Sequence, residues 1–375
     1  MKPILLSFYF PRSIEVEGAG ALFDSLARVL AAHDFEVTVH APLDGGRDVP
    51  YQIVNYHHQG RLSHNDYLRN LEDLGKSFPS LLVALASPAS FAWTRGALRE
   101  HPNAIYYFGS PLQDLGDIFH PPFSVQYFKH WIAKNRLLAR FGKPQVEICL
   151  VGTRFQKAQL VKLGVPEDSV HVLPLAISRE RIQHLDREEM RREFLLPEGP
   201  LVGYLGHFSP IKGVPVLIRA FERALEQRND LHLAIAWSGK GEESEKVRKM
   251  LEKDSIRERV HLTGVVDPYR FLAAMDLVCL PFVHSSFPHM PLVLLESFAV
   301  GTPVITSDVG GLSESVRKGE TGWLVPPNDA VRLAHAILDG LQNREHLANL
   351  GKETQRFIRN EECIEANLNR LLDLL

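Results

Sequence analysis

The sequence predicts an α/β protein made of two successive doubly wound domains, each built on a parallel sheet. Three observations support this prediction. Short aliphatic and β-branched runs alternate with helix-like apolar periodicity along the chain, as they do where helices join parallel strands. A charged stretch at 178–200, short of aliphatic residues, interrupts the pattern, which then restarts. The chain has 375 residues, which is enough for two domains of ordinary size.

The first half begins with a run that we expect to be a strand, ILLSFYF. The N-terminal segment that contains this run, MKPILLSFYFPRSIE, is apolar for only about eight residues and lacks a small-residue cleavage site. It therefore predicts a strand rather than a signal peptide. The helix expected next, within GALFDSLARVLAAH, has one apolar face made by Leu22, Leu26, Val29 and Leu30. The other expected strands are FEVTVHAP, YQIVNY, SLLVALA, AIYYF, VEICLVG and VHVLPL.

The second half repeats this alternation, with expected strands LVGYLG, LHLAIAW, VHLTG, LVCLPF, PVIT and GWLVP. The last segment predicts one long amphipathic helix with no strand after it. We therefore expect a first domain at 1–177, a linker at 178–199, a second domain at 200–352 and a C-terminal helix at 353–375. Ligands of such sheets bind beyond the carboxyl ends of the strands, so functional residues are sought in the loops that follow strands.

Composition argues against several classes of function. The formal net charge is −3, which gives no basic excess for a nucleic-acid partner. The three cysteines have no CxxC spacing and the 17 histidines form no HExxH motif, which argues against a disulfide framework or a metal site. No apolar run reaches the roughly 18 residues of a membrane span. These features predict a cytoplasmic protein.

One segment leaves membrane contact open. Residues 127–143, YFKHWIAKNRLLARFGK, predict a basic amphipathic helix with aromatic and aliphatic residues on one face. Such a helix can lie on an anionic membrane surface, here the inner face. It can equally pack its apolar face on a core and leave its basic face in water. The sequence does not decide between these two arrangements of the helix, so peripheral membrane contact is an alternative to a purely cytoplasmic location.

The segment at 290–311, MPLVLLESFAVGTPVITSDVGG, places a carboxylate in an apolar helix. Pro291 suits the first turn of this helix and Gly301 its C-terminal cap. A helix this apolar is expected to be buried, where an ionised Glu296 is costly unless it has a partner. A sugar diol supplies two hydroxyl donors that a carboxylate accepts in bidentate fashion. Alternatively, Glu296 pairs with an arginine or with backbone amides.

The same segment ends in a pair of glycines. Gly310 and Gly311 follow the strand PVIT and precede LSESVRKG, which predicts the next helix. Backbone amides at a helix N-terminus attract phosphate. A carboxylate that binds a ribose, beside a glycine turn that binds a diphosphate, accounts for both features. In the alternative interpretation the glycines only turn the chain.

A second segment, YLGHFSPIKGVPVLIRAF at 204–221, places His207 and Lys212 between a strand and a helix. Lys212 stands at the start of that helix, where a cation is unfavourable unless it faces an anion. A diphosphate leaving group is such an anion, and its developing charge needs a partner in the transition state. The alternative is a solvated lysine in a loop.

The first helix opens with the glycine pattern EGAGALF. Gly18 and Gly20 stand where a dinucleotide-binding fingerprint would place glycines. The third glycine is absent, and no acidic residue closes the next strand, so the pattern is only a weak indication of NAD binding. The chain has no Walker loop and no G-x-S-x-G motif.

Together these stretches resemble the retaining glycosyltransferases of family four, also called glycosyl transferases group 1. GHFSPIKGVPVLIRAF resembles the family's G-R-x-x-x-x-K-G segment, and PLVLLESFAVGTPVITSDVGGLSESVRKGETGWLVPPND resembles its donor-site signature. VHLTGVVDPYRFLAAMDLVCLPF resembles the segment whose backbone meets the nucleotide base, here around Gly264 and Val265. The resemblance implies the GT-B fold, in which two Rossmann-like domains face each other across a cleft.

The resemblance also implies roles for individual residues. Glu296 would bind the ribose hydroxyls of a nucleotide sugar, while Lys212 and His207 would meet the diphosphate during catalysis. The glycines at Gly18 and Gly20 would approach the donor from the first domain, and 353–375 would cross back to that domain. The backbone amides expected to help hold the diphosphate are those of Leu292, Val293, Gly310 and Gly311.

The implied reaction moves a hexose from a nucleoside-diphosphate sugar to an acceptor hydroxyl, with retention of anomeric configuration. The nucleotide sugar is the donor substrate, and neither a metal nor a cofactor is implied. The acceptor is a glycan, a lipid or a small molecule, and the sequence does not decide between them. Acceptor choice is expected to depend on the first domain.

Three positions depart from the family pattern. Pro288 stands where the family has the first glutamate of its pair, His207 stands where it has the diphosphate-binding arginine, and Phe108 stands where many members have a histidine. A histidine is neutral near pH 7 unless a neighbour raises its pKa. These departures keep two alternatives open: a nucleotide-sugar-binding or regulatory protein with impaired transfer, and a nucleotide-sugar epimerase of the same build.

Overall fold

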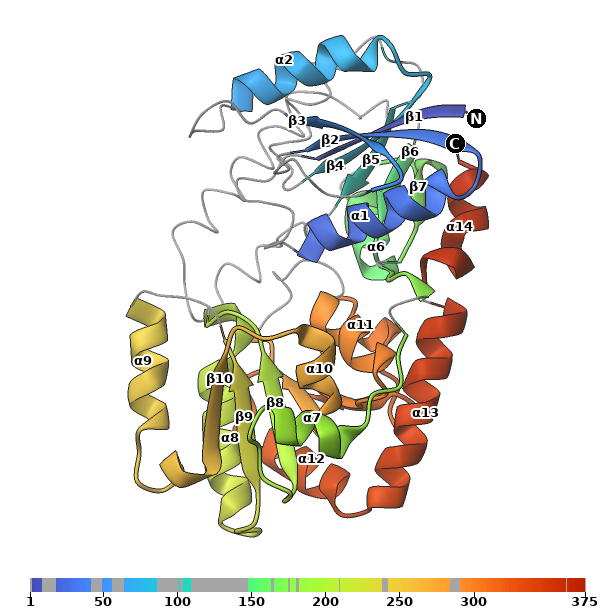
Figure 1. Ribbon diagram of the computed structural model, residues 1–375. Coiled ribbons are helices and arrows are strands. Elements are labelled where there is room, and N and C mark those ends of the chain that lie inside the picture. The colour runs from blue at the N-terminus through green and yellow to red at the C-terminus, as the bar shows by residue number, and fades with distance from the viewer. Residues whose placement is uncertain are drawn as a thin grey trace. The chain divides into compact units, whose positions relative to one another are not determined.

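A computed structural model gives the structure of the chain. It describes residues 2–8, 18–41, 49–55, 64–85, 101, 104–108, 148–162, 165–174, 176–179, 182–208, 210–237, 242–283, 291–361 and 363–374. The chain divides into two compact units, drawn in Figure 1. The N-terminal unit contains Met1–Ser178 and Cys363–Leu375, and the C-terminal unit contains Arg179–Phe287 and Pro291–Glu362. Each unit has its own parallel sheet, which confirms the predicted fold class.

The sheet of the N-terminal unit has the strand order β3-β2-β1-β4-β5-β6-β7, and every described pair in it is parallel. The chain starts in its middle, at β1, and builds outward in both directions. This is the doubly wound arrangement that the alternation of strand and helix patterns predicts. The strands are β1 (Lys2–Phe8), β2 (Phe35–Ala41), β3 (Gln52–Asn55), β4 (Ser80–Leu85), β5 (Ala104–Phe108), β6 (Ile148–Val151) and β7 (Val170–Val172).

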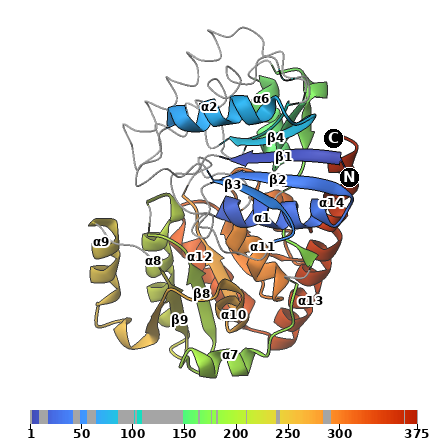
Figure 2. The same ribbon diagram turned by 45° about the horizontal axis from the view of Figure 1, so that its top comes forward.

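Helices cover both faces of this sheet. Figure 2 shows α2 (His64–Gly75) on one side of strands β1, β2 and β4, and α1 (Gly18–Ala31) on the other. On the α2 side, Leu5 of β1 packs with Leu71 of α2 and with Leu160 of α6 (Arg154–Lys162). On the α1 side lies α14 (Ile364–Leu372), which contacts α1. Because neighbouring strand residues point to opposite faces, the same short strands supply both cores.

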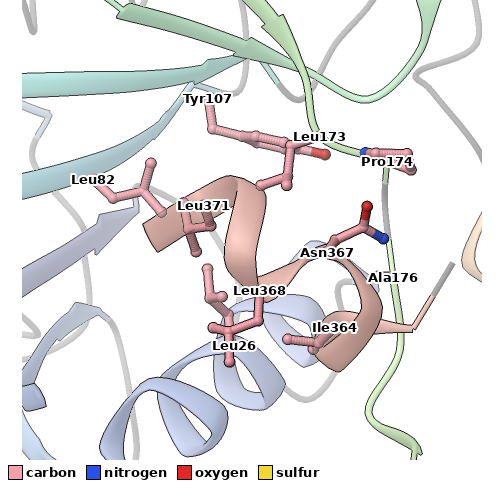
Figure 3. Close-up of a pocket in the computed structure, with 10 residues that line it drawn as sticks. All are labelled: Leu26, Leu82, Tyr107, Leu173, Pro174, Ala176, Ile364, Asn367, Leu368 and Leu371. Carbon is pink, nitrogen blue, oxygen red and sulfur yellow. The ribbon is translucent and has the colours of Figure 1, made fainter. Parts of the chain in front are cut away.

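A small apolar cavity lies between β4, β5, α1 and α14 (Figure 3). Its volume is about 30 Å³, which suits one or two waters rather than a substrate. The Asn367 amide donates to the Cys363 carbonyl oxygen at 3.2 Å and its oxygen accepts from Arg370 at 3.3 Å, so both polar atoms serve α14 itself. Lining residues are Leu26, Leu82, Tyr107, Leu173, Pro174, Ala176, Ile364, Asn367, Leu368 and Leu371.

The C-terminal segment is not the single helix expected at 353–375. Helix α13 (Arg344–Glu361) belongs to the C-terminal unit, and α14 begins afresh at Ile364 in the N-terminal unit. Between them Cys363 is extended, with φ −98° and ψ 155°, and forms a parallel bridge with Ile177. The Ile364 amide donates to the Ile177 carbonyl oxygen at 3.0 Å. This pairing with a distant segment overrides the amphipathic pattern that runs through the break.

We expect Leu371→Ala to destabilise the N-terminal unit. Leu371 is buried against the cavity, so truncation enlarges an existing void and costs about 2–5 kcal/mol of unfolding free energy. Thermal unfolding and limited proteolysis at the C-terminus measure the effect. Asn369→Ala is the matched control, because Asn369 is exposed on the same helix; equal losses in both variants would contradict the packing role of Leu371.

The sheet of the C-terminal unit has the strand order β10-β9-β8-β11-β12-β13, again with every described pair parallel. It also starts in the middle, at β8, and changes direction between β8 and β11. The strands are β8 (Leu201–Leu205), β9 (His232–Ala236), β10 (Val260–Gly264), β11 (Leu277–Leu280), β12 (Val304–Ser307) and β13 (Gly322–Val325).

Two helix layers cover this sheet. Helices α8 (Val214–Leu225) and α12 (Ala330–Leu341) pack against each other on one face. The right-handed crossover after β11 places α11 (Leu292–Ala299) on the opposite face, where it contacts α10 (Pro268–Ala273) and α13. The other described helices of this unit are α7 (Arg187–Glu193), α9 (Glu242–Leu251) and the 3₁₀ turns Pro210–Lys212, Arg257–Arg259 and Leu312–Glu314; the 3₁₀ turn Glu167–Ser169 belongs to the N-terminal unit.

The expected linker at 178–199 is instead, from Arg179 onward, part of the C-terminal unit. A buried ion pair holds it there. Arg191 of α7 is only 3% exposed and bonds Asp276 at 2.8 Å, just before β11. Arg187 bonds the other carboxylate oxygen at 3.0 Å, and the Leu201 amide donates to Asp276 at 2.8 Å. The charged composition that suggested a linker therefore supplies an anchor at the amino edge of the sheet.

We expect Arg191→Ala to lower the unfolding free energy of the C-terminal unit by about 3–5 kcal/mol, because it leaves the Asp276 carboxylate buried with part of its partners removed. Urea unfolding measures the loss. Arg192→Ala, one residue along and exposed, is expected to change stability by less than about 0.5 kcal/mol. Similar losses in the two variants would count against the buried pair.

Two further predictions concern membrane contact and Pro288. Within the described residues no helix has the length and apolar character needed to cross a bilayer. The segment 127–143 and Pro288 lie outside the described residues, so the membrane-contact alternative and the departure at Pro288 stay predictions from sequence.

Candidate functional site

The sheet of the C-terminal unit changes direction between β8 and β11, which makes this pair its topological switch point. These strands pair in parallel, through Leu277 with Val202 and Val278 with Gly203. The chain leaves β8 toward α8 and leaves β11 toward α11, on opposite faces of the sheet. In open parallel sheets ligands bind at the carboxyl edge where such connections diverge. The segments around Lys212 and Glu296 flank this point.

Lys212 lies over the carboxyl end of β8. It ends a 3₁₀ turn, Pro210–Lys212, directly before α8, so it lies between the strand and the start of the helix as the sequence predicts. A Cβ placed on Gly206 would lie 3.1 Å from Lys212 Nζ, so the ammonium sits directly above the first residue after the strand. Gly206 has φ +147° and its amide donates to the Ala236 carbonyl oxygen at 3.1 Å. The glycine gives the lysine room to reach the switch point.

His207 follows Gly206 and is exposed. Its carbonyl oxygen accepts a hydrogen bond from the Tyr204 hydroxyl at 2.9 Å. Burial raises the pKa of Tyr204 far above its usual range, so this hydroxyl stays protonated and remains a donor. The main chain at His207 is thereby fixed, while its imidazole faces solvent at the same edge as Lys212.

The turn that carries Lys212 is tied to the end of β11. The Val283 amide donates to the Ile211 carbonyl oxygen at 2.9 Å. Gly213, at the start of α8, has φ +67°, and a Cβ there would lie 1.8 Å from the Pro281 carbonyl oxygen. The backbones of the two diverging connections therefore touch, which fixes Lys212 against β11.

Glu296 lies in the second turn of α11. The sequence of this helix, LVLLESFA, is apolar, and Glu296 is its single ionisable residue. It is 7% exposed, so the predicted burial is confirmed. The neighbouring polar residue, Ser297, donates to the Thr302 carbonyl oxygen at 2.9 Å and so serves the fold. Pro291 caps α11 without a side-chain hydrogen bond, which leaves the first-turn amides of Leu292 and Val293 at the carboxyl edge.

The glycine turn follows β12, as predicted, but the helix expected after it is absent. Gly310 has φ +58°, and Gly311 precedes a single 3₁₀ turn at Leu312–Glu314. The Thr321 side chain accepts from the Arg317 amide and donates to the Ser315 carbonyl oxygen, both at 2.8 Å. These bonds turn the chain into β13. The macrodipole of one turn is small, so any anion here would depend on the glycine amides themselves.

Gly264 ends β10 and Val265 follows it on the same edge of the sheet. Gly264 has φ +74°, and its carbonyl oxygen accepts from the Trp237 amide at 3.1 Å. Val265 is 83% exposed, unusual for a large aliphatic residue. An exposed aliphatic side chain at the end of a strand suits contact with the flat face of an aromatic ring.

The topology therefore delivers the segments of Lys212, Glu296, Gly264 and Gly310 to one edge of one sheet. Gly18 and Gly20 lie in the first turn of α1, after β1 of the N-terminal unit, and Phe108 ends β5 there. Sequence reasoning missed Trp237, which follows β9 at the same edge of the sheet as the segments of Lys212 and Gly264. The available signal was an aromatic residue directly after a predicted strand.

We expect Gly213→Ala to destabilise the C-terminal unit by about 2–4 kcal/mol, because it adds a clash with Pro281 to an unfavourable φ. Chemical unfolding measures the loss. Gly319→Ala is the matched control, because Gly319 also has positive φ, +80°, but open space around it. The unfolding free energy of the control is expected to fall by only about 1 kcal/mol. A loss as large as that of Gly213→Ala would contradict the steric explanation.

The fold is that of a two-domain protein with a parallel sheet in each unit, and one family model matches its second half. Residues 186–357 match the family model described as glycosyl transferases group 1. This part of the chain therefore resembles that family, as the sequence motifs predict. The matched range contains β8–β13 and therefore all the candidate segments of the C-terminal unit.

Named relatives agree with this assignment. D-inositol 3-phosphate glycosyltransferase of Nocardia farcinica is 33% identical over 212 residues, which cover 54% of this chain and 46% of that protein. Alpha-D-kanosaminyltransferase of Streptomyces kanamyceticus is 30% identical over 197 residues, half of each chain. The chain thus spans about half the length of the curated relatives it matches.

Solved structures show the fold of the whole chain. Sucrose-phosphate synthase of Thermosynechococcus elongatus has a TM-score of 0.78 at 20% identity and covers 100% of this chain and 98% of its own. HepE of Anabaena, crystallised with UDP and glucose, has a TM-score of 0.77 at 16% identity, covering 99% and 98%. The chain has the two-domain GT-B fold, which confirms the prediction.

Proposed function

We propose that the protein is a retaining glycosyltransferase that moves a hexose from a nucleoside-diphosphate sugar to an acceptor hydroxyl. The observation that carries the proposal is that the segments of Glu296 and Lys212 reach the same edge of one sheet, at the switch point of a group 1 domain. A carboxylate such as Glu296 can accept hydrogen bonds from two hydroxyl donors.

The proposed donor is a nucleotide sugar. Glu296 would accept hydrogen bonds from the ribose hydroxyls, while the backbone at Gly264 and Val265 would meet the base. HepE, which has the same fold, was crystallised with UDP and glucose, which supports a nucleoside-diphosphate sugar here. The base and the sugar of this chain's donor are left to experiment.

The chemistry proposed for the site is stabilisation of the leaving group. The bond between the anomeric carbon and the diphosphate oxygen breaks, the acceptor oxygen forms the new bond to that carbon, and the hydroxyl proton passes to the departing diphosphate, on which negative charge grows. Lys212 would neutralise this charge, with His207 and the amides of Leu292 and Val293 as further donors, because fixed charges at a protected site stabilise a developing anion. The amides of Gly310 and Gly311 would extend this set. No metal or cofactor enters the proposal.

The acceptor is proposed to bind through the N-terminal unit, with Gly18 and Gly20 near the donor side. It carries a hydroxyl and is a glycan, a lipid or a small molecule. The relatives' names include a D-inositol 3-phosphate glycosyltransferase and a phosphatidyl-myo-inositol mannosyltransferase, which fits a polyol acceptor. Peripheral membrane contact through 127–143 and a cytoplasmic location remain parts of this proposal.

Thermal shift with UDP, GDP, ADP and TDP, each with and without EDTA, tests the donor site. A diphosphate at 100 times its Kd adds roughly 2.7 kcal/mol of stability, and we expect one base to do so regardless of EDTA. Glu296→Gln and Lys212→Ala are each expected to weaken that nucleotide by about tenfold or more. Lys352→Ala, an exposed lysine of α13, is the control and should bind like the wild type.

The outcomes separate the proposed enzyme from its alternatives. Release of the diphosphate in the presence of the matching nucleotide sugar and an acceptor supports transfer. Tight nucleotide binding with no turnover of any sugar would instead favour the binding or regulatory protein. Interconversion of a free nucleotide sugar without acceptor would identify an epimerase, and no binding of any diphosphate would refute the donor site itself.

A further inference from the structure

Trp237 joins the two sides of the proposed donor site. It follows β9, and its amide donates to the Gly264 carbonyl oxygen at 3.1 Å, which fixes the segment expected to meet the base. Its ring stacks on Phe208, with centroids 5.0 Å apart and planes within 2°. Phe208 lies in the connection that leads to Lys212. One residue thus holds both connections at the carboxyl edge.

Phe208 is well placed to pass this contact on to Lys212. Its side chain is 7% exposed, so the stack is part of the packed interior rather than a surface contact. It also contacts the ring of Tyr204, with centroids 6.3 Å apart, and Tyr204 bonds the His207 carbonyl oxygen. Moving Phe208 would therefore move the backbone on which His207 and Lys212 depend.

The side chain of Trp237 is held by contacts on its ring, with Phe208 and Arg248, rather than by a hydrogen bond of its indole nitrogen. The guanidinium carbon of Arg248, from α9, lies 4.9 Å from the ring centroid. The indole nitrogen is buried and has no hydrogen-bond partner within the part of the chain that the structure describes. A phenylalanine at this position would therefore keep the stacking and lose no hydrogen bond, which makes it a conservative test.

We infer that Trp237 is a positioning residue that fixes the spacing between the base side and the diphosphate side of the nucleotide site. The inference rests on the proposed function. A nucleoside diphosphate must contact both sides at once, so its affinity depends on their spacing being set before binding. A nucleoside alone, or inorganic pyrophosphate alone, meets one side and does not depend on that spacing.

Calorimetric titration of the nucleoside diphosphate selected by the thermal-shift panel, its nucleoside and pyrophosphate tests this inference. Trp237→Ala is expected to lower the diphosphate affinity about five- to tenfold while the nucleoside and pyrophosphate affinities change less than about twofold. Trp237→Phe is expected to restore most of the affinity. Phe208→Leu, which keeps apolar volume but removes the stack, should reproduce the selective loss if Trp237→Ala does not fold.

Arg191→Ala serves as the stability control, because it weakens the same unit at the opposite edge of the sheet. It should leave the ratio of diphosphate to nucleoside affinity unchanged. Equal losses for all three ligands in Trp237→Ala, or unchanged diphosphate affinity, would overturn the positioning role while the donor site stands. Failure of the wild type to bind any nucleotide would instead overturn the proposed function.

Discussion

The pairing of β8 with β11 is the constraint from which the candidate site follows. Parallel strands bring their carboxyl ends to one edge, and the change of direction between these two strands sends α8 and α11 to opposite faces. The diverging connections contact each other through their backbones, at Gly213 with Pro281 and at Ile211 with Val283. Lys212 and Glu296 owe their places to this geometry, because each belongs to one of the two connections.

The two edges of the same sheet use charge differently. At the amino edge, the Asp276 carboxylate forms ion pairs with Arg187 and Arg191 and accepts a hydrogen bond from a backbone amide. These bonds hold α7 to the sheet. At the carboxyl edge, Lys212 lies over a glycine and Glu296 lies in a helix with no other ionisable residue. Substitutions around Asp276 are therefore expected to act through stability, whereas Lys212 and Glu296 are the residues proposed to contact the ligand.

Much of this was readable from the sequence, because strands and glycine-flanked loops are local features. The strand runs, the burial of Glu296 and the placement of Lys212 after a strand follow from apolar pattern alone. The errors came from non-local contacts: Cys363 breaks a continuous amphipathic pattern to pair with Ile177, and Arg191 reaches Asp276 across 85 positions. The role of Trp237 was equally invisible, since the stack with Phe208 joins two different loops.

The N-terminal unit offers a different chemistry at the ends of β1 and β2. Ser7 bonds His40 Nδ1 at 3.0 Å and the Tyr67 hydroxyl at 3.1 Å, and all three side chains are buried. Burial lowers the pKa of His40 to about 4, so this cluster is neutral near pH 7. Its three polar side chains bond one another inside the core, so this strand end is held by hydrogen bonds rather than by an ion pair. The two units therefore stabilise their sheets by different means: the C-terminal unit uses the buried ion pair of Arg191 and Asp276, and the N-terminal unit uses a neutral hydrogen-bonded cluster.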